Sequence, residues 1–276
     1  MNNMLLRALS GAVYVAVIVL CVLYGPRWFT LLMGVFGVIG ISEVVRMICR
    51  DARRFVAAEY VDLGFYALIL LYPLFMANLG GDAFKIVTAL AFIYLPLRMI
   101  LAVMQRGDGA LRQAVGAFFG FIYVGMPLLF ANYCYSTVYV FAPDRAVTVM
   151  LLSFVLIWLN DTGAYLSGRT FGRTKLCEHL SPKKTWEGFW GGFVLCIAAS
   201  VVFAFCVGYN PLILGCYGAL VSVASTYGDL FESLIKRRCG VKDSGTLIPG
   251  HGGILDRIDS YLAVAPIAAL MLFVLY

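Results

Sequence analysis

Two pairs of acidic residues near the C-terminal end of the sequence carry its strongest chemical signal. Asp229 precedes Glu232 by three residues, and Asp256 precedes Asp259 by the same interval. Residues three apart on a helix share a face, so each pair can direct two carboxylates to one side. Such carboxylates repel one another unless a positive charge separates them, and Mg²⁺ is a hard cation that prefers oxygen ligands. The spacing therefore favours a metal site, with Asp161, at the end of an apolar run, as a further candidate ligand.

Cations and glycines fill the interval between the two acidic pairs. They are Lys236, Arg237, Arg238, Lys242, Gly245, Gly250, Gly252 and Gly253, with Arg257 inside the second pair. Glycine lets a ligand approach the backbone closely, and cations attract phosphate. His251 could contact phosphate, move a proton or fill a turn, and a single histidine does not decide between these roles. The alternative is an acid–base network that joins two helix ends, with Arg237 and Arg257 as counterions.

A second polar segment, residues 160–188, contains a possible phosphate cradle. The order Ser-Pro-Lys-Lys-Thr fits a helix start, with Ser181 as the cap and Pro182 in the first position. The first turn would then hold Lys183, Lys184 and Thr185. Amide groups at a helix N-terminus favour an anion, so the segment predicts a triphosphate site. The alternatives are a juxtamembrane basic cluster and, for Asp161, an ion pair with an arginine that locks two helices.

The composition places both segments in a membrane protein. Of the 276 residues, 62% are hydrophobic and only 13% are charged, and the mean hydropathy is +0.90. We expect an all-α polytopic integral membrane protein. About nine apolar runs could span a bilayer, the first being a retained helix and not a cleaved signal peptide. They are 8–25, 28–48, 61–80, 84–104, 113–134, 146–166, 188–208, 211–235 and 260–276.

The chain divides by function within this helical protein. Residues 1–145, with about five spans, are expected to form a scaffold for lipid and for a possible homodimer. Residues 146–276 are expected to form the catalytic region, with active-site loops 160–188 and 229–259. Gly34, Gly37 and Gly40 give the second span a small-residue face that packs either a helix of the same chain or a partner.

The distribution of positive charge orients the chain. With nine spans, most of the 21 Lys and Arg residues fall on the side that holds the N-terminus and both polar loops. The positive-inside rule makes that side cytoplasmic and leaves the C-terminus outside. Eight cysteines occur without a Cys-x-x-Cys pair, which is typical of small core residues.

Both polar segments resemble those of a known family. Residues 233–259, SLIKRRCGVKDSGTLIPGHGGILDRID, are similar to the signature of phosphatidate cytidylyltransferases, also called CDP-diacylglycerol synthases. NDTGAYLSGRTFGRTKL and SPKKTWEG resemble a second block of that family. The resemblance covers the C-terminal part of the chain, whereas residues 1–150 match only in hydropathy and helix count. It implies a Mg²⁺-dependent enzyme of the bacterial inner (plasma) membrane that makes CDP-diacylglycerol and pyrophosphate from CTP and phosphatidic acid.

The resemblance also implies roles for individual residues. Asp229 and Asp256 align with metal-binding aspartates, and a second cation such as K⁺ is a further implication. We expect Asp161, Glu232 and Asp259 as additional or outer ligands. Phosphates would be held by Lys183, Lys184 and Lys242 with help from Ser181 and Thr185, while Arg237 and Arg257 would meet the lipid phosphate or balance the acids. Because phosphatidic acid is already an oxyanion, the obstacle is electrostatic repulsion and no catalytic base is expected.

Three other activities compete with this interpretation. A CTP-dependent polyprenol-type kinase would release CDP in place of pyrophosphate, and an ether-lipid synthase would use a different lipid. A transporter would place its charged residues at broken helices near the middle of the bilayer. Here the acids cluster at an expected cytoplasmic edge, which favours an enzyme. The basic residues lie in short juxtamembrane loops, so nucleic-acid binding has no support.

Overall fold

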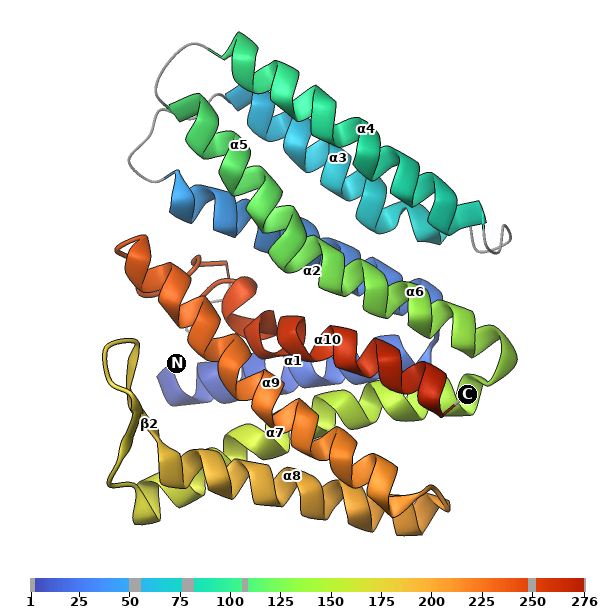
Figure 1. The fold of residues 1–276 in the computed structure, drawn as a ribbon, viewed down its shortest axis with the longest axis vertical. Coiled ribbons are helices and arrows are strands. Elements are labelled where there is room, and N and C mark those ends of the chain that lie inside the picture. Colours follow the sequence, from blue (N-terminus) through green and yellow to red (C-terminus); the bar gives the residue numbers. More distant parts are fainter. Residues whose placement is uncertain (1–2, 50–55, 76–81, 106–108, 248–251, 276) are drawn as a thin grey trace. The chain divides into compact units, whose positions relative to one another are not determined.

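The computed structural model describes residues 3–49, 56–75, 82–105, 109–247 and 252–275. Nearly all of this chain is helical (Figure 1). The elements are α1 (Asn3–Leu23), α2 (Pro26–Ile48), α3 (Val56–Phe75), α4 (Asp82–Met104), α5 (Gly109–Gly120), the π-helical turn η1 (Phe121–Gly125), α6 (Met126–Phe141), α7 (Pro143–Phe171), β1 (Lys175–Cys177), β2 (Ser181–Thr185), α8 (Trp186–Val207), α9 (Pro211–Arg238) and α10 (Leu255–Val274).

The helices follow the apolar runs of the sequence. Within the described ranges, six helical segments are long and apolar enough to cross a membrane: Pro26–Ile48, Gly109–Phe141, Pro143–Phe171, Trp186–Val207, Pro211–Arg238 and Leu255–Val274. Local signals set several ends, as at α9, where the Asn210 side chain accepts a hydrogen bond from the backbone N–H of Leu212 (2.9 Å). The prediction of an all-α polytopic membrane protein is thus confirmed at this level, with one short hairpin as an exception.

The chain forms two compact units. The first comprises residues 1–143 together with residues 243–258, and the second comprises residues 144–242 together with residues 259–276. The signature segment is therefore divided, since its central loop packs with the N-terminal helices.

In the first unit, the glycine face of α2 packs against α3. A Cβ added at Gly34 would overlap the side chain of Leu71, and one at Gly37 would lie 2.7 Å from Leu70 Cδ1. The small residues thus allow two helices of the same chain to approach closely. A buried ion pair joins α3 to α4, because Arg98 Nε lies 3.0 Å from Asp62 Oδ1.

In the second unit, a buried amide fixes α7 to its neighbours. Ser222 Oγ on α9 donates to Asn160 Oδ1 (2.6 Å), and Asn160 Nδ2 donates to Thr226 Oγ1 (3.3 Å). On the side of α8, a Cβ at Gly192 would lie 2.7 Å from Asn160 Oδ1. These contacts set the position of the next residue on α7, the candidate ligand Asp161.

The predicted helix start at Ser181 is wrong. Ser181–Thr185 is the strand β2, which pairs with β1 in an antiparallel hairpin at one end of α7 and α8 (Figure 1). The helix begins at Trp186, and Thr185 Oγ1 caps it by accepting from the backbone N–H of Gly188 (3.2 Å). The start shifts because Glu187, in the first turn, accepts hydrogen bonds from the N–H groups of Arg173 and Thr174. These bonds hold the base of the hairpin, in which Ser181–Thr185 is extended.

Candidate active site

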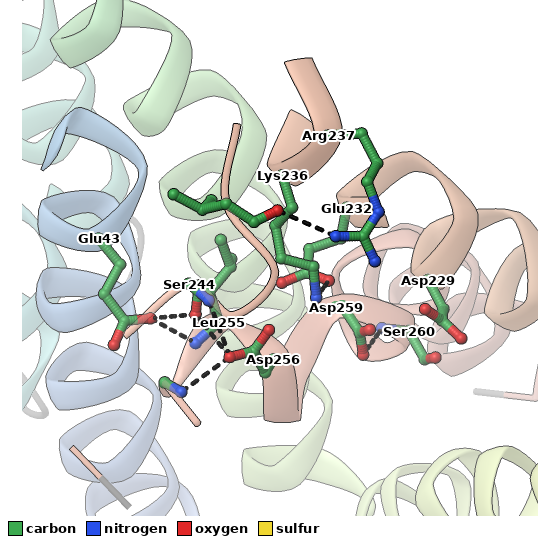
Figure 2. Close-up of polar contacts among 12 residues, drawn as sticks. Glu43, Asp229, Glu232, Lys236, Arg237, Ser244, Leu255, Asp256, Asp259 and Ser260 are labelled. Carbon is green, nitrogen blue, oxygen red and sulfur yellow. Dashed lines mark hydrogen bonds and ion pairs between the residues drawn. The ribbon is translucent and has the colours of Figure 1, made fainter. Parts of the chain in front are cut away.

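Three carboxylates meet where α9 approaches α10. Oxygen atoms of Asp229, Glu232 and Asp259 all lie within 4.8 Å of one another, and Figure 2 shows the three side chains. Glu232 is completely buried, while the other two are half-buried. The helices come this close because a Cβ at Gly228 would lie only 2.9 Å from the Asp259 carbonyl oxygen. The i, i+3 spacing therefore brings Asp229 and Glu232 together on α9, and the crossing of the two helices adds Asp259.

Two lysines neutralise part of this charge. Lys184 Nζ, from β2, lies 2.6 Å from Asp229 Oδ2, and its side chain is 27% exposed. Lys236 forms an ion pair with Glu232, one turn earlier on α9. The cluster thus holds three carboxylates and only two ammonium groups, and the remaining negative charge favours a further cation. Because the donors are carboxylate oxygens, they suit a hard ion such as Mg²⁺.

Asp161 lies outside this group of three. It is exposed on α7, where Lys184 and Asp229 are its electrostatic neighbours. In the part of the chain that the structure describes, no ion pair joins Asp161 to an arginine. The arginine lock that the sequence left open is therefore not observed among these residues.

Asp256 belongs to the first unit and holds the signature loop. Its Oδ2 accepts hydrogen bonds from the backbone N–H of Gly253 (2.8 Å), the backbone N–H of Ser244 (3.0 Å) and Ser244 Oγ (3.0 Å). A carboxylate that accepts several donors is fixed in one orientation. Asp256 is thus a pre-oriented acid at the start of α10.

Glu43 supports the same loop, although it was not a candidate from the sequence. It is 5% exposed on α2, and its carboxylate accepts from Leu255 N (2.8 Å), Ser244 Oγ (2.9 Å) and Ile254 N (3.1 Å). Figure 2 shows the bonds from Leu255 and Ser244. They satisfy backbone donors at the N-terminus of α10, where negative charge is stabilising. The available signal was an acid within the second apolar run.

The glycines of the signature make room for these two acids. A Cβ at Gly253 would lie 2.5 Å from Glu43 Oε1, and one at Gly245 would also overlap Glu43. Gly252 has a φ of 81°, and a Cβ there would lie 2.5 Å from Asp256 Oδ2. The described glycines therefore surround carboxylates of the chain itself. Gly250 and His251, two further candidates from the sequence, lie outside the described residues.

The remaining candidates occupy varied positions. Lys183 is exposed on β2, and Lys242 is exposed in the loop after α9. Arg237 Nη1 donates to the Val241 carbonyl oxygen (3.0 Å), so it fixes the end of α9. The backbone carbonyl of Arg257 accepts from Tyr14 Oη (2.8 Å). Thr185 acts as a helix cap, and Ser181 lies in the strand.

The fold and the site define an integral membrane protein with a carboxylate and lysine cluster suited to a cation and a phosphate ligand. Residues 5–275 match the model of the cytidylyltransferase family, and the chain belongs to that family.

Several relatives are phosphatidate cytidylyltransferases. The one from Staphylococcus haemolyticus is 30% identical over 276 residues, covering 98% of this chain and 99% of the relative. The one from Haemophilus influenzae is 33% identical over 284 residues, covering 94% and 95%. Chloroplastic phosphatidate cytidylyltransferase 4 of Arabidopsis thaliana is 35% identical over 229 residues, covering 73% of this chain and 54% of that protein. The family resemblance drawn from the signature is confirmed.

Proposed function

We propose that the protein transfers a cytidylyl group from CTP to phosphatidic acid, giving CDP-diacylglycerol and pyrophosphate. The observation that carries this proposal is the similarity to phosphatidate cytidylyltransferases along nearly the whole of both chains. The cluster of Asp229, Glu232 and Asp259 with Lys184 supports it, because both substrates are phosphate anions.

The reaction needs charge neutralisation more than proton transfer. A phosphate oxygen of phosphatidic acid attacks the α-phosphorus of CTP, and the bond to the bridging oxygen of the β-phosphate breaks. The electron pair leaves with pyrophosphate. Since nucleophile and nucleotide are both anionic, cations that screen their repulsion and stabilise the leaving group lower the barrier. Lys183, Lys184 and Lys242 are the proposed phosphate-binding cations.

Asp229, Glu232 and Asp259 are the proposed holders of Mg²⁺, which when bound supplies positive charge to the phosphates. Asp161 and Asp256 are further proposed ligands, and a second cation such as K⁺ is part of the same proposal. Lys184 holds Asp229 at 2.6 Å, so we infer that it moves from the carboxylate to a phosphate oxygen when the nucleotide binds. Contacts with the substrates are also proposed for Arg237, Arg257, Ser181, Thr185 and His251.

The proposed setting is the inner (plasma) membrane of a bacterium. Nine spans would leave the N-terminus and the reacting residues on the cytoplasmic side, where CTP is available, and the C-terminus outside. The charge distribution of the sequence supports this orientation. A homodimer is also proposed.

The test uses the detergent-purified protein, Mg²⁺, phosphatidic acid and CTP labelled at the α-phosphate. Asp229→Asn and Asp256→Asn are compared with the wild type, and Asp144→Asn, an exposed acid in the first turn of α7, is the control. We expect label in the lipid phase with pyrophosphate released, and loss of both products in the two site variants. Aqueous label with CDP formed would indicate a kinase. Folded protein that turns over no CTP would contradict the enzyme assignment and favour a transporter.

A further inference from the structure

An apolar groove runs along the first unit between α1 and α2. Its volume is about 430 Å³, and its wall includes Leu9, Val13 and Val17 of α1, Leu32 and Phe36 of α2, and Ile254. This volume lies within the range of small-molecule sites, which are usually lined by apolar side chains. The groove therefore offers a place for an extended hydrocarbon group.

The groove is lined in part by the signature segment. Ile254, which forms part of its wall, precedes Asp256 by two residues. Tyr14 also lines the groove, and its hydroxyl donates to the backbone carbonyl of Arg257 (2.8 Å). An occupant of the groove would thus meet the segment that carries the proposed ligand Asp256. This continuity distinguishes the groove from an isolated apolar surface.

The α1 side of the groove has the dimensions of one lipid leaflet. Leu9, Val13 and Val17 follow one another at intervals of four and form a single stripe, with exposed fractions of 58%, 55% and 38%. At 1.5 Å per residue the stripe is about 12 Å long. This is close to half of the roughly 30 Å hydrocarbon core of a bilayer.

We propose that the groove holds one acyl chain of the lipid substrate, with its phosphate directed toward the segment from Ile254 to Arg257. This assignment rests on the proposed function. The occupant is a lipid tail because the side-chain wall is almost entirely hydrocarbon and includes Ile254, two residues before Asp256. The groove is thereby a determinant of acyl-chain selectivity.

The test fills the groove with a larger side chain and varies the length of the lipid. Val13→Trp is compared with Leu20→Trp, which alters an exposed position of the same helix outside the groove. For Val13→Trp we expect the KM for long-chain phosphatidic acid to rise about tenfold, the scale on which apolar pockets discriminate. The KM values for CTP and for dihexanoyl phosphatidic acid should not change. Leu20→Trp should leave all three KM values unchanged.

The outcomes separate this inference from the proposed function. Absence of cytidylyl transfer in the wild type would remove the proposed function itself. If the wild type is active but Val13→Trp affects short and long lipids equally, or neither, the groove assignment is wrong. A photoreactive acyl chain on phosphatidic acid should crosslink to α1, and excess phosphatidic acid should compete. Equal competition by phosphatidylcholine would identify an unspecific lipid contact and contradict the proposal. Dissociation of a dimer by Val13→Trp would also contradict it, because the occupant would then be a second copy of the chain.

Discussion

The side chain of Glu43 accepts a hydrogen bond from the backbone N–H of Leu255 at 2.8 Å, across 212 residues of sequence. It joins an early apolar helix to the first residue of α10, which carries Asp256 in its next position. Because Glu43 also accepts from Ser244, one buried carboxylate fixes both sides of the signature loop. Glu43 is therefore a positioning residue in the proposed function.

Removing the charge of Glu43 should loosen this loop. Glu43→Gln weakens three hydrogen bonds to a charged acceptor, each contributing about 1.5–3 kcal/mol. We expect a lower kcat with little change in the KM for CTP, and a lower midpoint of thermal unfolding. Glu178→Gln, at an exposed hairpin position, is the control. An unaltered kcat in Glu43→Gln would show that the loop does not depend on this carboxylate.

A methyl group at Gly253 should act through the same contact. Gly253→Ala places a Cβ 2.5 Å from Glu43 Oε1, which forces the loop apart and should cost roughly 1–3 kcal/mol of stability. Gly64→Ala is the contrasting variant: a Cβ there meets nothing within 4 Å, and Ala in the interior of α3 should raise stability by about 0.5–1 kcal/mol. Thermal unfolding in detergent measures both variants. If Gly253→Ala unfolds at the same midpoint as the wild type, the loop adjusts to the added methyl group without loss of stability.

Breaking the buried pair of Glu232 and Lys236 should destabilise the second unit. The side chains are 0% and 11% exposed, so Glu232→Gln leaves an ammonium group in a poorly hydrated place. The expected loss is about 3–5 kcal/mol. The double variant Glu232→Gln with Lys236→Met should recover stability but not cytidylyl transfer, if Glu232 serves the cation. If the double variant recovers both its stability and cytidylyl transfer, Glu232 has a structural role alone.

Lys184 should affect both the Mg²⁺ requirement of the enzyme and its KM for CTP. Lys184→Met removes the cation that lies 2.6 Å from Asp229. We expect half-maximal activity at a lower Mg²⁺ concentration, because the carboxylate loses a competitor, and a higher KM for CTP. Lys183→Met, on the same strand but exposed, should raise only the KM for CTP. Steady-state titration of Mg²⁺ at saturating CTP separates the two effects, and an unchanged Mg²⁺ requirement in Lys184→Met would contradict this role.

Chelation should abolish turnover and reduce stability together. Two lysines neutralise only part of the charge of three carboxylates whose oxygens lie within 4.8 Å, so Mg²⁺ should raise the unfolding midpoint of the wild type. Asp259→Asn should reduce this increase. If Mg²⁺ stabilises the wild type and Asp259→Asn equally, the cation binds elsewhere.

The helical membrane fold and the family could both be predicted from the amino-acid sequence. Apolar runs long enough for a bilayer predict helices because every backbone polar group must be satisfied internally, and the described helices lie on those runs. The signature of residues 233–259 identified the family from local order alone. Spacing likewise placed Asp229 and Glu232 on one face of α9.

The meeting of groups far apart in the sequence could not be predicted in this way, because it depends on how the helices pack. The third carboxylate of the cluster, Asp259, joins through the crossing of two helices, and Lys184 arrives on a hairpin that local helix signals did not predict. Glu43 was missed because its partners are about 200 residues away, and a residue type gives no information about what will pack against it. Periodicity reports contacts within an element, whereas contacts between elements depend on packing, which only the folded chain defines.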